Sequence, residues 1–147
     1  MKRNAYIMIA MIVLVGSLAV TANAQIGSRT QLIANVPFDF SVGGQTLPAG
    51  EYTVRQMTPD SGSAIVQLRS RDGHSRALVQ MNSVIGKVND CALLIFHRYG
   101  NRYFFAQAWT PGYSEGLQAQ KTRAERAAQR EIASLNTQAE TVALRVR

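Results

Sequence analysis

Few side chains in this sequence have the chemistry that catalysis or metal binding requires. The chain has two histidines, His74 and His97, and a single cysteine, Cys91. Nucleophilic catalysis needs a nucleophile, a base and a group that orients the base, but no serine lies in a nucleophile-elbow motif. The spacing of His, Cys and carboxylates matches no metal site, and no glycine-rich loop opens a helix to hold a phosphate. The sequence therefore predicts no catalytic residue, metal or cofactor. The alternative is a hydrolase of envelope polymers, and the sequence neither excludes nor selects a carboxylate pair for glycoside hydrolysis.

Two clusters of basic and aromatic side chains are the candidate binding residues. The first flanks an Asp72-Gly73 turn and suits phosphate or carboxylate groups of an anionic polymer; it consists of Arg69, Arg71, His74 and Arg76. The second flanks Gly100-Asn101 and suits stacking on a sugar; it consists of Arg98, Tyr99, Arg102 and Tyr103. The competing interpretation of the first cluster is that its charges are simply exposed to solvent. For the second cluster it is a cation–π contact within the hairpin.

The first 24 residues have the pattern of a secretory signal peptide. Lys2 and Arg3 form a positive start, Ile7 to Val20 is an apolar run, and Ala22-Asn23-Ala24 is a small-x-small cleavage site. The run is shorter than the roughly 20 apolar residues of a membrane-spanning helix, so an uncleaved anchor is the weaker interpretation. We therefore expect cleavage near Ala24 and a secreted or periplasmic protein whose single domain comprises residues 25–147.

Charge and cysteine content restrict the partners of such an exported domain. The formal charge of the whole chain is +7, which suits anionic lipids or polysaccharides of an envelope and, outside the cytoplasm, makes nucleic acid an unexpected partner. We predict no transmembrane segment in the mature chain. Cys91 is the only cysteine, so an internal disulfide is excluded. We interpret Cys91 as a small buried side chain at the start of a strand, with an intermolecular disulfide as the alternative.

Turn residues recur about every 8 to 12 residues, as in an antiparallel β-sandwich or a partly closed barrel of about 7–9 strands. Asp72-Gly73 is typical of a two-residue hairpin turn. It predicts that Arg69 lies opposite Arg76, Leu68 opposite Ala77 and Val66 opposite Val79. Counting back from the loop between Thr58 and Gly62 places Val54 opposite Val66, Tyr52 opposite Leu68 and Glu51 opposite Arg69. Both hairpins then bury the same set of side chains on one face.

The next hairpin requires a cover because both of its faces are apolar. Gly100-Asn101 predicts the pairs Arg98 with Tyr103, His97 with Phe104, Phe96 with Phe105 and Ile95 with Ala106, and places Trp109 on the face of Leu94 and Phe96. Downstream, Thr122-Arg123-Ala124-Glu125 is a capping box that opens a helix over 122–136. We expect this helix to pack on the sheet through a stripe formed by Ala124, Ala127, Ala128, Ile132 and Leu135. A final strand is predicted over 140–146.

Two segments carry a resemblance to a known group of proteins. The sequence from Asn35 to Gly43 reads NVPFDFSVG, and that from Thr46 to Val54 reads TLPAGEYTV; further along, Leu94 to Phe104 reads LIFHRYGNRYF. These segments resemble a family of small exported proteins of unknown function that is numerous in acidobacterial genomes. The resemblance implies export and a compact β domain, and it assigns no catalytic or ligand-binding residue. We expect Asp39 within the first segment to be satisfied by backbone amides.

Together these observations predict an exported, noncatalytic β-sandwich module that binds a protein or another component of the envelope. A hydrolase acting on extracellular or envelope polymers is the alternative.

Overall fold

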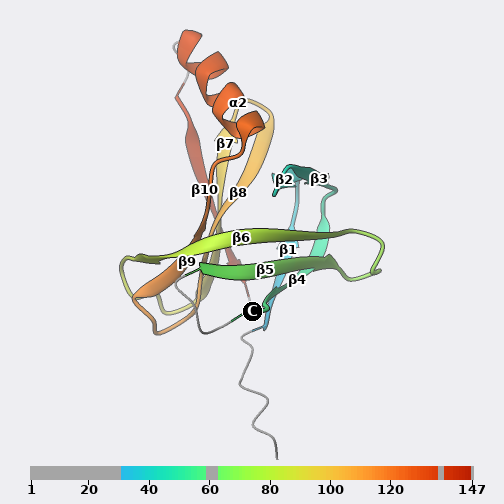
Figure 1. Ribbon diagram of the computed structural model, residues 1–147, viewed down its shortest axis with the longest axis vertical. Coiled ribbons are helices and arrows are strands. Elements are labelled where there is room, and N and C mark those ends of the chain that lie inside the picture. Colours follow the sequence, from blue (N-terminus) through green and yellow to red (C-terminus); the bar gives the residue numbers. More distant parts are fainter. Residues whose placement is uncertain (1–30, 59–62, 136–137, 147) are drawn as a thin grey trace, which may run out of the picture.

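The fold consists of one open β-sheet and one helix (Figure 1). The computed structural model describes residues 31–58, 63–135 and 138–146, so the predicted signal peptide lies outside the described residues. The elements are β1 (Gln31–Val36), β2 (Phe40–Val42), β3 (Gln45–Leu47), β4 (Gly50–Gln56), β5 (Ser63–Ser70), β6 (Arg76–Ile85), β7 (Ala92–Tyr99), β8 (Arg102–Trp109), β9 (Glu115–Ala119), α2 (Arg123–Ser134) and β10 (Glu140–Val146). The predicted all-β class with a C-terminal helix is confirmed, with ten strands in the described residues where 7–9 were expected. No helix in these ranges is both long and apolar enough to cross a membrane.

The sheet runs in the order β1-β4-β5-β6-β9-β8, and β8 continues it through β7 to β10. The pairs are antiparallel except where β2 runs parallel to β8, with Phe40 opposite Tyr103. β1 and β10 come close to each other without forming a ladder, so the sheet curls on itself but does not close. This arrangement agrees with the predicted sandwich or partly closed barrel.

The β5–β6 hairpin has the predicted register. Arg69 lies opposite Arg76, and Val66 lies opposite Val79. Alternate residues of the two strands are buried, as the period of two requires. The register is therefore as predicted, but the predicted two-residue turn is wrong: β5 ends at Ser70, β6 begins at Arg76, and Ser70 N donates to Ser75 O at 2.8 Å across a longer loop.

The predicted register between β4 and β5 is wrong by two residues. Val54 lies opposite Leu68, where the sequence placed it opposite Val66. The reason is local: Thr58 Oγ1 accepts a hydrogen bond from Ile65 N at 3.0 Å, and Met57 N donates to Ile65 O at 2.7 Å, so the two strands join through a longer connection than expected. A shift by two leaves every side chain on its predicted face, which is why the core is unaffected.

The β7–β8 hairpin follows its predicted register only as far as a bulge. His97 faces Phe104 and Phe96 faces Phe105, but Ile95 faces Gln107 because the register shifts between Ile95 and Phe96. The bulge adds one residue to β8 and reverses the faces beyond it. As a result Ala108, predicted on the opposite face, joins the core beside Leu94, and the prediction that Trp109 shares that face is wrong.

Trp109 instead packs against two glycines, Gly116 of β9 and Gly86, which follows β6. A Cβ at Gly116 would lie 2.6 Å from the indole ring, and one at Gly86 would lie 2.4 Å from it. Both glycines are thus required by the close approach of the ring. The tryptophan is only 7% exposed, and its Nε1 donates to Gln107 Oε1 at 3.0 Å.

The buried residues form two separate hydrophobic clusters. The larger fills the inside of the curled sheet and includes Tyr52, Met81 and Phe96. The smaller lies between α2 and the end of the β7–β8 hairpin and consists of Tyr99, Phe104, Ala128 and Ile132. Figure 1 shows α2 standing beside the tip of this hairpin, beyond the body of the sheet. The helix therefore packs on the hairpin as predicted, but it covers only the tip end of the second apolar face, at Tyr99 and Phe104.

The predicted buried stripe of the helix is partly wrong. Thr122 caps the helix, and its Oγ1 accepts from Glu125 N at 3.1 Å. The side chains that α2 buries are Glu125, Ala128 and Ile132, whereas Leu135 is 69% exposed. Ala124 and Ala127 are exposed as well. The helix is oriented so that the Glu125 carboxylate faces the hairpin, where His97 and Tyr99 are its polar partners. The final strand begins at Glu140, as predicted.

Cys91 lies immediately before β7 and is half-buried, with a free thiol. Its predicted position at a strand start is confirmed, but its burial is only partial.

Candidate functional site

The turn between β5 and β6 is shaped by Asp72. Its Oδ1 accepts a hydrogen bond from His74 N at 3.0 Å and another from the Ser70 hydroxyl, which itself accepts from Ser75 N at 2.9 Å. The hydrogen bonds from Ser70 and His74 hold the pKa of the Asp72 carboxyl below its usual range. This carboxylate therefore serves the turn that positions the basic side chains around it.

Arg69 and Arg76 are the distinctive pair of this tip. They lie directly opposite each other on the exposed face of β5 and β6. Neither guanidinium forms an ion pair or hydrogen bond with any residue that the structure describes. Like charges facing each other across two strands are destabilising, so an anion bound between them would relieve a repulsion that the fold itself leaves in place.

The prediction that Glu51 lies opposite Arg69 is wrong. Because of the register shift, Thr53 lies opposite Arg69, and Glu51 instead approaches Arg71, with Nη1 3.5 Å from Oε2. The Arg71 side chain is 80% exposed, so this pair is loose and contributes little. His74 is exposed beside it. All four predicted residues of the first cluster thus lie at one hairpin tip.

An open pocket of about 540 Å³ adjoins this tip, between residues 48–52 and residues 70–75. Its wall is part of the TLPAGEYTV segment. Asp39 Oδ1 accepts from Ala49 N at 2.8 Å, which confirms the expected role of that carboxylate. The Tyr52 hydroxyl donates to Pro48 O at 2.6 Å, and burial, followed by the charges of Asp72 and Asp39, raises the pKa of Tyr52. The segment is therefore accounted for by structural contacts around an open pocket.

The second predicted cluster is occupied by contacts within the fold. Arg98 lies 5.6 Å from the centroid of the Tyr103 ring, which agrees with the cation–π interpretation, and its Nη1 donates to Glu140 Oε2 at 3.0 Å. Arg102 pairs with Glu131 of α2. Tyr103 stacks on Phe38 with ring centroids 3.8 Å apart, and Tyr99 is only 3% exposed. The structure therefore does not present these four side chains together on the surface.

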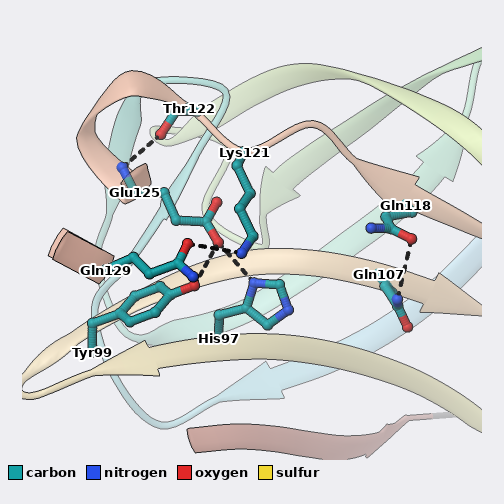
Figure 2. Close-up of polar contacts among 8 residues, drawn as sticks. All are labelled: His97, Tyr99, Gln107, Gln118, Lys121, Thr122, Glu125 and Gln129. Atoms are coloured by element: carbon teal, nitrogen blue, oxygen red, sulfur yellow. Dashed lines mark hydrogen bonds and ion pairs between the residues drawn. The ribbon is translucent and has the colours of Figure 1, made fainter. Parts of the chain in front are cut away.

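A buried carboxylate joins α2 to the β7–β8 hairpin (Figure 2). Glu125 is only 4% exposed, lies 2.7 Å from His97 Nδ1, and accepts a 3.3 Å hydrogen bond from the Tyr99 hydroxyl. Burial, with the charge of Glu125 as a further cause, raises the pKa of Tyr99 to about 12. The sequence pointed to Glu125 only as the last residue of the capping box, and no local pattern indicated that it would face inward.

This cluster has some features of a catalytic base but lacks a nucleophile. A carboxylate at Nδ1 orients an imidazole, as it does in hydrolytic triads. Among the described residues, however, no serine, threonine or cysteine hydrogen-bonds to His97, and Tyr99 bonds to the carboxylate. In the same ranges no three His, Cys, Asp or Glu side chains come together as a metal site would need. The contacts are those of a structural joint.

A groove that the sequence did not reveal lies between β6, β9 and the start of α2. It encloses about 460 Å³, and its polar lining consists of Asn82, Ser83, Gln118, Gln120, Lys121 and Arg126. These residues come from three separate elements, so only knowledge of the β6–β9 pairing could have brought them together. The signal available in the sequence was that Asn82 and Gln118 each occupy a position on the exposed side of their strand.

Comparison with known proteins adds no relative. No family model matches the sequence, and neither the search of curated proteins nor the search of solved structures found a match.

Proposed function

We propose that residues 25–147 form an exported, noncatalytic β module that binds an anionic polymer of the cell envelope at the β5–β6 tip. The observation that carries this proposal is the opposed, uncompensated pair Arg69 and Arg76. Export rests on the signal-peptide pattern of the first 24 residues, from Lys2 to Ala24.

The geometry of the tip suits polymeric carboxylates or phosphates. Each guanidinium presents a planar fork of donors that matches the two oxygens of such a group. Two forks on adjacent strands lie about 5 Å apart at the backbone, so neighbouring charges on a polymer can engage both. Arg71 and His74 supply further donors at the same tip. Because these groups are exposed, binding should weaken as salt screens them.

A hydrolase of envelope polymers is the second candidate, and the contact between His97 Nδ1 and Glu125 favours it. It would use His97 as a general base. The absence of a hydroxyl or thiol bonded to His97 in the described residues makes binding without turnover the better-supported function.

The test begins with protein recovered from the extracytoplasmic fraction, where an intact mass matching residues 25–147 would verify cleavage. We expect this protein to bind immobilised polygalacturonate in low salt and to bind its methyl ester, which lacks the charges, much less. Replacing both opposed arginines, Arg69→Gln with Arg76→Gln, should weaken binding at least tenfold, since each tenfold change requires only about 1.4 kcal/mol.

The matched control removes the same charge elsewhere. Arg130→Gln with Arg145→Gln alters two exposed arginines on α2 and β10 that form no ion pair in the described residues. Equal losses in the two double variants would show attraction to net charge alone and would overturn the assignment of the tip. Release of shortened polymer that stops in His97→Ala would establish the hydrolase instead.

A further inference from the structure

The outer face of β6, β9 and β8 carries a row of carboxamide side chains. Asn82 lies opposite Gln118, and Gln118 lies opposite Gln107 on the next strand. Gln107 Nε2 donates to Gln118 Oε1 at 3.5 Å (Figure 2). Three strands thus place three amides side by side, across the direction of the strands.

A hydrogen bond from Trp109 to Gln107 fixes the orientation of this row of amides. Trp109 Nε1 donates to Gln107 Oε1 at 3.0 Å, which fixes which end of the Gln107 amide faces Gln118. The indole itself packs closely against Gly116 and Gly86, which restricts the first member of the row. Gln118 therefore uses its oxygen within the row and keeps its amide hydrogens for a ligand. The side chains of Asn82 and Gln120 form no hydrogen bond with the described residues.

Two basic residues line the same groove of about 460 Å³. Arg126 and Lys121 both line it, and Lys121 Nζ donates to Gln129 Oε1 at 3.0 Å. Arg126 has no ion-pair partner in the part of the chain that the structure describes. Glu125, the adjacent acid, is turned into the joint with His97 and is only 4% exposed. The groove therefore combines neutral amides with the positive charge of Arg126, while the Ser83 hydroxyl in its lining already donates to Glu115.

We propose that this groove binds an acidic saccharide. A sugar hydroxyl both donates and accepts, and a carboxamide offers both functions on one planar group, so Asn82, Gln118 and Gln120 would bind adjacent hydroxyls. Arg126 would bind the carboxylate of the sugar through its fork, with Lys121 adding charge. This class of ligand is favoured over a free anion because most of the polar lining is neutral.

The groove is a different site from the β5–β6 tip. Asn82 and Arg76 lie at different points of the same outward row of β6, about 20 Å apart at roughly 3.3 Å per residue. The inference rests on the proposed function only in that the ligand is an envelope polymer, and the two sites can be tested separately.

The experiment titrates the mature protein with tetragalacturonate, with its methyl ester, and with inorganic phosphate, following backbone amide chemical shifts. We expect tetragalacturonate to shift the amides of β6, β9 and the start of α2. Asn82→Ala with Gln118→Ala should weaken both oligosaccharides at least tenfold. Arg126→Gln should weaken tetragalacturonate by a similar factor while leaving the ester unchanged.

Gln45→Ala, an exposed amide on edge strand β3, is the control and should bind as the unaltered protein does. Phosphate binding at Arg126 as tightly as tetragalacturonate would show a simple anion site and overturn the proposal, as would unchanged tetragalacturonate binding in the Asn82 and Gln118 double variant. The variant lacking Arg69 and Arg76 should still bind tetragalacturonate in the groove. Unchanged polymer binding in that variant, with the groove still occupied by tetragalacturonate, would therefore contradict only the proposed function.

Discussion

Replacing Glu125 should destabilise the protein far more than its place on a surface helix suggests. Glu125→Ala removes the acceptor for both His97 Nδ1 and the Tyr99 hydroxyl. A buried hydrogen bond to a charged group contributes about 1.5–3 kcal/mol, and a donor left buried without a partner costs about 1–3 kcal/mol. The Tyr99 contact is long at 3.3 Å, and His97 can still reach water because its side chain is 24% exposed. We therefore expect a loss of about 2–4 kcal/mol in the free energy of unfolding, which is less than the sum of two full hydrogen bonds and two unpaired donors.

The measurement is urea unfolding at pH 7, read as the shift in midpoint at unchanged slope. Glu131→Ala is the matched control, since it removes a carboxylate from the same helix and breaks a pair with Arg102 in which the side chains are 62% and 50% exposed. Such exposed pairs contribute about 0–1 kcal/mol. A loss in Glu125→Ala no larger than that in Glu131→Ala would refute the view that the carboxylate fastens α2 to the hairpin.

Two further predictions concern the same interface. Burial and then Glu125 raise the pKa of Tyr99 from its ordinary value of 10.0 to about 12, so the stabilisation present below about pH 10 should be lost as the pH rises towards 12; melting temperatures from pH 8 to 12 should show this fall, and Tyr99→Phe should reduce it. Ile132→Asp, at a side chain only 6% exposed, should cost at least about 2 kcal/mol, while Leu135→Asp should stay within about 0.5 kcal/mol; equal melting temperatures for the two variants would contradict the orientation of the helix.

The parts of the fold that local chemistry determines were predictable. Asp72-Gly73 predicts the β5–β6 register because it marks the centre of the connection, although the loop around it is longer than the two residues expected. Thr122 and Glu125 mark the start of α2 because a capping box is a contact within one turn. The basic cluster around the Asp72-Gly73 turn was predictable for the same reason, as its members are neighbours in sequence.

The remaining features depend on contacts between distant residues. Both faces of the β7–β8 hairpin are apolar, so alternation could not indicate the bulge beside Ile95. A search for an apolar helix stripe necessarily passes over Glu125, whose partner His97 lies 28 residues away. The amide groove requires that Asn82 and Gln118 be paired across β6 and β9, and no turn joins these two strands.

The position of Trp109 allows its intrinsic fluorescence to report binding in the groove. The chain has one tryptophan, so intrinsic indole fluorescence comes from a single buried site. Its ring nitrogen is connected through Gln107 to Gln118, which lines the groove. A ligand that takes hold of Gln118 changes the polarisation of that chain of hydrogen bonds, and the emission of Trp109 would register it without any attached dye. Among the described residues no hydrogen bond connects the β5–β6 tip to the indole, so one spectrum distinguishes occupancy of the groove from binding at the tip.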